Sequence, residues 1–259
     1  MNEKRVLIAG GGPAGATLGA ILAKEGLKVQ LVEKYRFPRP HIGESLQPAA
    51  FDLLDFYLPG FVETIAQEGF ARKYGAVYRW GNDRKLWYVM FDDRLDDGFD
   101  HISRQDLLEG DYAMSWQVNR ARFDQMLLDH AEDLGVEVHQ ETTAIAPIMD
   151  GERMTGLRVK NSEGEADMYA DVVVDATGTN CLFGRAFRTT RVVDDLKATA
   201  HWTYFRGAGG LGDPLDRDIQ LIVSVKEGWI WFIPVSDERT SIGVVTHEGK
   251  KLSKDRYLE

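Results

Sequence analysis

A glycine-rich turn between a short apolar run and a helical segment constrains the fold of this chain more than any other feature. Residues 5–9 (RVLIA) are typical of a buried parallel strand. The turn at residues 10–15 (GGGPAG) has the spacing G-x-G-x-x-G, and apolar residues at helical spacing follow it as far as Gly26. A second apolar run, residues 29–32, ends in Glu33. This order of strand, glycines, helix, strand and acid predicts a nucleotide-binding βαβ unit.

The chemistry of such a unit is that of a pyrophosphate site. Glycines let the backbone approach the phosphates, and N–H groups at the start of the helix hold the anion. Glu33 can accept hydrogen bonds from a ribose 2′-hydroxyl, which favours FAD or NAD over NADP. The cofactor-binding candidates in this unit are Gly10, Gly11, Gly12, Ala14, Gly15 and Glu33.

Composition excludes several classes of partner. The 259 residues include 31 Lys and Arg against 41 Asp and Glu, a net charge of −10, which argues against nucleic acid. The one cysteine, Cys181, excludes an internal disulfide framework and any CxxC metal or redox site. No apolar run approaches the roughly 20 residues of a membrane span, and the early first strand leaves no room for a signal peptide. We therefore expect a globular cytoplasmic protein with no membrane partner and no metal.

Residues 37–48 (FPRPHIGESLQP) resemble a segment of the flavin-dependent halogenases. The resemblance is to the branch that acts on phenols, pyrroles or carrier-bound aromatic groups, within the superfamily of p-hydroxybenzoate hydroxylase-like FAD enzymes. In that family this segment follows the first βαβ unit and lines the flavin, which makes Glu44 and Ser45 cofactor-binding candidates. The alternative is that both residues cap a helix that starts near Leu46; the two interpretations are compatible.

Further segments continue the resemblance. Residues 117–124 (QVNRARFD) are similar to the family's second FAD contact, in which the arginine at the position of Arg120 reaches the cofactor. A forked, permanently charged guanidinium suits a pyrophosphate, although Arg120 could instead be a solvated partner of Asp124 one helical turn later. The resemblance also implies Ala144 and Asp175 as cofactor-binding residues; Asp175 begins a D-A-T-G turn of the kind that lies beside the nucleotide in these flavoproteins.

Two tryptophans separate a halogenase from a monooxygenase in this family. Residues 228–234 (GWIWFIP) contain W-x-W-x-I-P, which matches the halogenase signature residue for residue. In a strand, Trp229 and Trp231 project to one face. The resemblance implies that they wall off the organic substrate from the flavin and suppress direct hydroxylation. The alternative is a pair of indoles that packs in the core.

Residues 69–81 (GFARKYGAVYRWG) resemble the segment that carries the family's active-site lysine, and Lys73 takes that position. The alternation of side chains predicts one strand of a substrate-side sheet with Lys73 near its entry. An ammonium there could donate a hydrogen bond to hypohalous acid, or a neutral amine could form a chloramine, a route that burial favours because it lowers a lysine pKa. The alternative is an ordinary surface lysine.

The resemblance implies a FADH2-dependent halogenase. A flavin C4a-hydroperoxide would oxidise chloride or bromide to hypohalous acid, which would chlorinate an electron-rich aromatic substrate by way of Lys73, with Trp229 and Trp231 in the same catalytic set. Reduced flavin would come from a separate flavin reductase, because no second G-x-G-x-x-G is present. The substrate would be a small aromatic molecule or a carrier-protein-tethered one. Two alternatives stay open: an FAD-dependent aromatic monooxygenase or geranylgeranyl-reductase-like oxidoreductase, and a non-catalytic flavin-binding fragment.

The expected fold is α/β with two interleaved domains. Residues 1–70 and 117–180 would form a Rossmann-like FAD-binding domain, and residues 71–116 and 181–259 a mostly antiparallel substrate-side sheet. Family members usually carry a further flavin motif, a small-residue loop near the halide and a helical C-terminal region, none of which follows Thr246. We therefore expect a fragment, a trimmed chain or an unusually reduced form, which could be inactive on its own.

Overall fold

The computed structural model describes residues 4–82, 85–95, 102–208 and 218–247. The chain forms two compact units: unit 1 is residues 1–42, 56–59 and 120–191, and unit 2 is residues 43–55, 60–119 and 192–259. This division places residues 43–55 and 60–70 in unit 2, whereas the sequence-based boundaries put them in the FAD-binding domain. The functional roles of the two predicted domains stay predictions.

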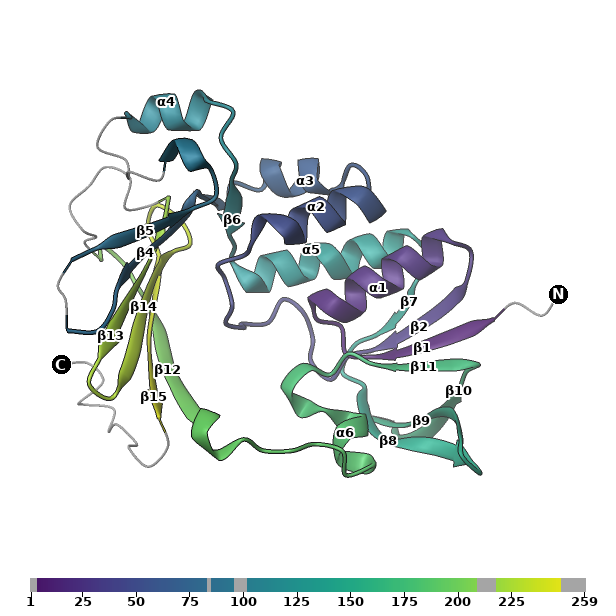
Figure 1. Cartoon of the computed structure of the whole chain (residues 1–259). Coiled ribbons are helices and arrows are strands. Elements are labelled where there is room, and N and C mark those ends of the chain that lie inside the picture. The colour runs from purple at the N-terminus through teal and green to yellow at the C-terminus, as the bar shows by residue number, and fades with distance from the viewer. Residues whose placement is uncertain (1–3, 83–84, 96–101, 209–217, 248–259) are drawn as a thin grey trace. The chain divides into compact units, whose positions relative to one another are not determined.

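Unit 1 is built around a parallel sheet in the order β11-β1-β2-β7. Its strands are β1 (Arg5–Ala9), β2 (Lys28–Val32), β7 (Glu137–His139) and β11 (Val172–Asp175). The helices α1 (Pro13–Lys24) and α5 (Arg120–Asp133) lie side by side over one face of this sheet (Figure 1). The strands are nearly continuous apolar runs because a parallel sheet is covered on both faces.

A second, antiparallel sheet covers the other face of the parallel sheet in unit 1 (Figure 1). Its strands are β8 (Thr143–Asp150), β9 (Arg153–Asn161) and β10 (Gly164–Tyr169). Leu7 of β1 and Leu157 of β9 are fully buried in the core between the two sheets. Three short helices complete the unit and the segment that leaves it: η2 (Gly178–Asn180), α6 (Leu182–Ala186) and η3 (Asp194–Leu196).

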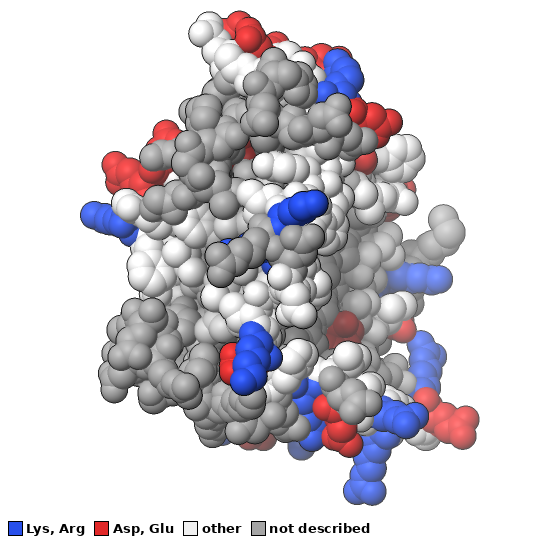
Figure 2. Space-filling view, turned by 60° about the vertical axis from the view of Figure 1, so that its left-hand side comes forward, with Lys and Arg blue, Asp and Glu red and all other residues white. Residues whose placement is uncertain are grey.

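Unit 2 contains a six-stranded sheet in the order β12-β15-β14-β13-β4-β5, antiparallel except between β13 and β4. The strands are β4 (Gly75–Arg79), β5 (Trp87–Met90), β12 (Ala198–Phe205), β13 (Gln220–Val225), β14 (Gly228–Pro234) and β15 (Thr240–His247). In Figure 2, which brings this side of the molecule forward, most charged side chains lie toward the margins of the visible face. The predicted α/β class with a mostly antiparallel sheet is confirmed.

A small strip of three extended segments lies apart from the large sheet in unit 2. The strands β3 (Ala71–Lys73) and β6 (Ser115–Gln117) pair antiparallel, and an isolated bridge between Ser45 and Gln117 adds a third segment. The expectation that residues 69–81 form one strand is therefore wrong. The chain changes sheet at Tyr74, and Gly75 allows this because a Cβ there would lie 2.4 Å from the carbonyl oxygen of Val89.

The remaining helices are α2 (Pro48–Tyr57), α3 (Phe61–Gln67), η1 (Asp93–Leu95) and α4 (Arg104–Glu109). In the part of the chain that the structure describes, none of the helices has the length and apolar character that crossing a bilayer requires.

Candidate functional site

A cavity of about 370 Å³ opens in unit 1 at the carboxyl ends of β1, β2 and β11. This edge of a parallel sheet is where α/β folds bind ligands. Of the predicted cofactor-binding residues, those that line it are Gly10, Gly12, Ala14, Glu33, Arg120 and Ala144. The structure thus brings together residues from the glycine turn, the end of β2, the start of α5 and the start of β8.

The glycine turn is enforced by close backbone packing. Gly10 has φ +107°, and a Cβ there would lie 2.3 Å from the carbonyl oxygen of Ala176. A Cβ on Gly15 would lie 1.9 Å from the carbonyl oxygen of Gly10. Gly12 is the N-cap of α1 and provides no side-chain cap, so the N–H groups of the first helical turn are left for a ligand.

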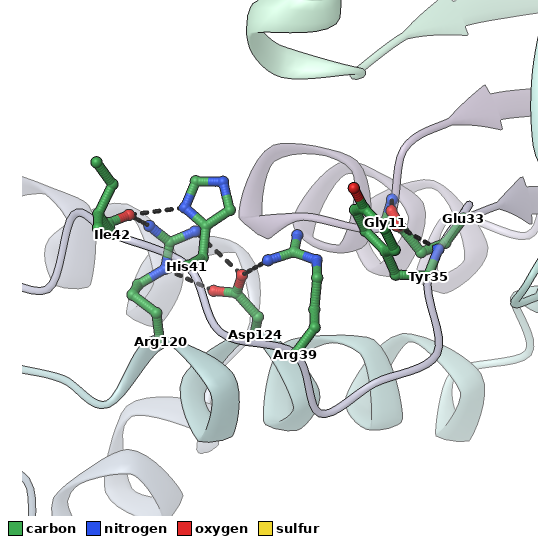
Figure 3. A network of polar contacts seen from close by, with 8 residues as sticks. All are labelled: Gly11, Glu33, Tyr35, Arg39, His41, Ile42, Arg120 and Asp124. Atoms are coloured by element: carbon green, nitrogen blue, oxygen red, sulfur yellow. Dashed lines mark hydrogen bonds and ion pairs between the residues drawn. The ribbon is translucent and has the colours of Figure 1, made fainter. Parts of the chain in front are cut away.

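Glu33 is held by the turn that it faces. One carboxylate oxygen accepts a hydrogen bond from the N–H of Gly11 at 2.7 Å, and the other accepts one from the N–H of Tyr35 at 2.9 Å (Figure 3). The residue is only 5% exposed. Each oxygen retains a lone pair for a further donor. The carboxylate is therefore fixed in position at the cavity wall before any hydroxyl group arrives.

Arg120 shares the carboxylate of Asp124 with Arg39. Its Nε and Nη2 donate to the two Asp124 oxygens at 2.7 and 3.0 Å, while Nη1 of Arg39 donates to one of them at 3.2 Å (Figure 3). Arg120 also donates to the carbonyl oxygen of Ile42 at 2.6 Å. The sequence also allowed Arg120 to be a solvated partner of Asp124. The partner is Asp124, but Arg120 is buried rather than solvated. Two guanidiniums thus share one fully buried carboxylate, and both of them line the cavity.

Asp175 does not line the cavity but shapes its wall. Its carboxylate accepts hydrogen bonds from the N–H and hydroxyl of Thr177 and from the N–H of Phe183. Burial raises the pKa of Asp175, but these hydrogen bonds outweigh burial and the pKa is lowered. The carboxylate thus stabilises the turn that carries residues 176–180, which do line the cavity.

Sequence reasoning did not single out Arg39 or residues 176–180 as site residues. Arg39 lines the cavity, and its guanidinium lies 3.6 Å from the position of a Cβ on Gly12. A signal was present, because Arg39 stands in the FPRPHIGESLQP segment and the turn after Asp175 is rich in small residues. The sequence does not show that these two segments lie close together in the fold.

Glu44 and Ser45 belong to unit 2 and do not line the cavity of unit 1. Glu44 is buried, and its carboxylate accepts hydrogen bonds from the N–H of Gly43 at 3.0 Å and from the hydroxyl of Tyr204 at 3.0 Å. The backbone of this segment pairs with β6, since the N–H of Val118 donates to the carbonyl oxygen of Glu44. The roles of Glu44 and Ser45 in cofactor binding stay predictions.

Lys73 is buried in unit 2, with 1% of its surface exposed, so it is not a surface lysine. Its Nζ donates a hydrogen bond to the carbonyl oxygen of Leu46 at 3.0 Å and lies 4.9 Å from the ring centroid of Phe91. No carboxylate compensates the charge in any contact that the structure describes for this amine. Burial lowers the pKa of Lys73 from 10.5 to about 8.

Trp229 and Trp231 lie on one face of β14, as predicted, with ring centroids 5.8 Å apart. The Nε1–H of Trp231 donates to the hydroxyl of Ser241 at 3.1 Å, and its ring packs over Gly243, where a Cβ would lie 2.2 Å away. Trp231 is part of a core cluster with Ile233, and Trp229 is half-buried against it. Core packing is therefore present; the separating role of the pair stays a prediction.

A family model described as an FAD binding domain matches residues 3–253 of this chain. The chain belongs to the FAD-binding domain family. The prediction of FAD as cofactor is confirmed by this match, and the site of this FAD-binding chain fits the group. The glycine cradle, the uncapped start of α1, the buried Glu33 and the cationic Arg39–Asp124–Arg120 cluster suit ribose and pyrophosphate.

Relatives of this FAD-binding chain confirm the resemblance to flavin-dependent halogenases. It is 33% identical to a tryptophan 2-halogenase of Chondromyces crocatus over 95% of this chain and 44% of that protein. It is 30% identical to the 1H-pyrrole-2-carbonyl-[peptidyl-carrier protein] chlorinase of Pseudomonas fluorescens, over 100% and 59%. The solved structure of the myxobacterial chondrochloren halogenase superimposes with a TM-score of 0.81 at 33% identity, over 96% and 54%. The chain spans about half the length of the relatives that it matches.

Proposed function

We propose that the chain is the FAD-binding and lysine-bearing part of a FADH2-dependent halogenase that chlorinates an electron-rich aromatic substrate. The observation that carries the proposal is a buried lysine with no acidic partner among its described contacts, in a chain whose relatives are halogenases. Burying an uncompensated amine is unfavourable. Such a group is therefore a candidate for chemistry rather than for stability.

Bound FAD, when reduced, supplies with dioxygen the oxidising power that converts halide to hypohalous acid. The residues of unit 1 bind and orient the cofactor. Glu33 accepts from the ribose, the start of α1 and the guanidinium of Arg120 take the pyrophosphate, and Ala144 contacts the cofactor from β8. Asp175 acts indirectly, by holding the turn at residues 176–180.

Lys73 acts on the hypohalous acid. With a pKa of about 8, roughly one-tenth of the amine is neutral at pH 7 and the rest is ammonium. The ammonium, which gives one N–H to Leu46, has two more that polarise the halogen donor by hydrogen bonding. The neutral amine instead attacks the halogen of HOCl, which forms an N–Cl bond and releases water. Both routes deliver an electrophilic halogen beside the β3–β6 strip.

Trp229 and Trp231 keep the aromatic substrate apart from the flavin in this proposal. Two indoles on one face of β14 form a rigid apolar wall, and Ser241 and Gly243 of β15 hold Trp231 in place. A wall of this kind favours halogenation over direct hydroxylation. A hydroxylated product would instead support the monooxygenase alternative.

The partners follow from the same chemistry. A separate flavin reductase would supply reduced FAD. We expect both proteins to act in the cytoplasm. One relative is named as a chlorinase of a pyrrole on a peptidyl carrier protein, and that name supports a carrier-tethered aromatic as well as a free phenol or pyrrole. Chloride and bromide are the candidate halides.

The deciding experiment supplies the purified chain with FAD, a flavin reductase, NADH, dioxygen and chloride, and offers phenol and pyrrole as probes. Mass spectrometry should show the chlorine isotope pattern in the product. Lys73→Met should lower chlorination at least about 100-fold without loss of FAD binding. The matched control is Lys160→Met, because Lys160 is an exposed lysine on β9. Unlike Lys73 in its described contacts, this amine has a carboxylate partner, Glu165, at 3.7 Å. Chlorination by Lys73→Met at the wild-type rate would refute the role of this lysine, and FAD binding without turnover in the wild type would favour a non-catalytic fragment.

A further inference from the structure

Three buried polar atoms on the β3–β6 strip have no hydrogen-bond partner within the described parts of the chain. They are Oγ of Ser45, Oγ of Ser115 and Oε1 of Gln117. Ser115 and Gln117 are fully buried as residues, with 0% exposure. Buried hydroxyl and amide oxygens in folded proteins nearly always bind a protein group, an ordered water or a ligand. The strip therefore has unused hydrogen-bonding atoms that a bound molecule could satisfy.

Strand register places these atoms on the same face as Lys73. Lys73 pairs with Ser115, and Ser45 pairs with Gln117. Ser115 and Gln117 are two residues apart on β6, so their side chains point to one face, and directly paired side chains are close neighbours. The Lys73 side chain crosses β6 on this face to reach the carbonyl oxygen of Leu46. The three unpartnered atoms thus lie on the same face of the strip as the buried amine.

The donors and acceptors select a class of ligand. Nε2 of Gln117 donates to the carbonyl oxygen of Ile219 at 3.3 Å, which orients the amide so that Oε1 is the free atom. Oε1 can only accept, the two serine hydroxyls can donate or accept, and the Lys73 ammonium can only donate. A ligand that satisfies them all carries at least one donor hydrogen and one acceptor atom, and a small hydroxyl-bearing molecule has both. A bare halide ion fits poorly, because the amide oxygen would repel it.

We propose that Ser45, Ser115 and Gln117 hold a small neutral hydroxyl-bearing molecule beside Lys73. Water and hypohalous acid share the required chemistry, since each has at least one O–H to donate to Gln117 and an oxygen to accept from serine or ammonium. In the resting protein the site holds water. During turnover hypohalous acid displaces that water, and Ser115 and Gln117 act as positioning residues for Lys73; this second half rests on the proposed halogenase function.

The water half is tested without any activity. A high-resolution crystal structure of the FAD-bound chain should show an ordered water within hydrogen-bond distance of Ser115 Oγ and Gln117 Oε1, which is lost in Ser115→Ala. NMR titration of the lysine ε-CH2 signals should show that Ser115→Ala lowers the pKa of Lys73 by about one. The reason is that the ammonium loses the oxygen of the bound water. Thr246→Val, which removes a buried hydroxyl from β15 of the same unit, should leave that pKa unchanged. A dry strip, or an unchanged Lys73 pKa in Ser115→Ala, would overturn this half.

The hypohalous-acid half is tested in the chlorinating protein. Ser115→Ala and Gln117→Met should lower aromatic chlorination about tenfold, while free hypochlorous acid, trapped with monochlorodimedone, rises. Unchanged product and unchanged leakage in both variants would overturn the positioning role and leave the water site standing. A wild-type chain that binds the water but never chlorinates would count against the halogenase proposal, and with it the hypohalous-acid half, and not against the hydroxyl-binding site.

Discussion

Lys73 reaches across β6 to the carbonyl oxygen of Leu46, 3.0 Å from its Nζ. This contact joins the segment that carries Lys73 to the segment that carries Glu44 and Ser45, both within unit 2. Because the partner is a neutral carbonyl, the hydrogen bond orients the amine without restoring the pKa that burial lowers.

Stability should depend on pH through Lys73. Its folded pKa of about 8 is below the ordinary 10.5, so the unfolded chain binds more protons between these values. The free-energy cost of burying the charged Lys73 amine is at most about 3 kcal/mol. This cost is fully present below pH 8 and decreases as pH rises toward 10.5. Lys73→Met removes this cost but also removes the hydrogen bond to Leu46. The free energy of unfolding at pH 7 should therefore rise by about 1–2 kcal/mol. Urea titrations of both proteins at pH 7 and pH 9.5 check this: the gap should narrow at the higher pH, and a constant gap would contradict the burial argument.

Asp124→Asn should destabilise unit 1 and weaken FAD binding. The substitution removes the carboxylate charge that Arg39 and Arg120 share, and loss of a buried partner costs about 3–5 kcal/mol. The control is Asp129→Asn on the exposed side of the same helix, for which we expect a change below about 0.5 kcal/mol. Equal urea midpoints for the two variants would show that the shared carboxylate is unimportant.

Gly15→Ala should be far more harmful than Gly19→Ala, although both glycines are buried in α1. A Cβ on Gly15 would lie 1.9 Å from the carbonyl oxygen of Gly10, whereas one on Gly19 would meet the nearest atom, from Val136, at 3.4 Å. We expect Gly15→Ala to abolish FAD binding, and Gly19→Ala to change stability by less than about 1 kcal/mol because alanine favours the helix. Flavin absorbance after purification and thermal unfolding give the comparison, in which similar behaviour of the two variants would be the contrary result.

Glu33→Gln should weaken FAD binding by about 10- to 100-fold, or about 1.4–2.8 kcal/mol. The amide can accept from only one of the Gly11 and Tyr35 N–H groups, and the ribose hydroxyls lose a charged acceptor. Quenching of flavin fluorescence measures the affinity. Glu165→Gln, at an exposed position of β10, serves as the control; an affinity loss shared by both variants would point to net charge rather than to the ribose contact.

Gly243→Ala should displace the indole of Trp231. The added Cβ would lie 2.2 Å from the ring, which cannot yield without losing its hydrogen bond to Ser241. We expect a shift in tryptophan fluorescence and, in an active protein, a rise in hydroxylated over chlorinated product. An unchanged emission spectrum would show that the ring accommodates the methyl group in place.

The sequence by itself determined the βαβ unit, the glycine turn, Glu33 and the common face of Trp229 and Trp231, because each follows from local spacing along one strand or helix. The burial of Lys73 and the switch of sheet at Tyr74 were not determined in this way. Only the tertiary structure brought Arg39 and Asp124 together across 85 residues, and Lys73 to Leu46 across 27. Side-chain periodicity reports which way a residue points, whereas burial and charge pairing depend on which distant segment lies opposite it.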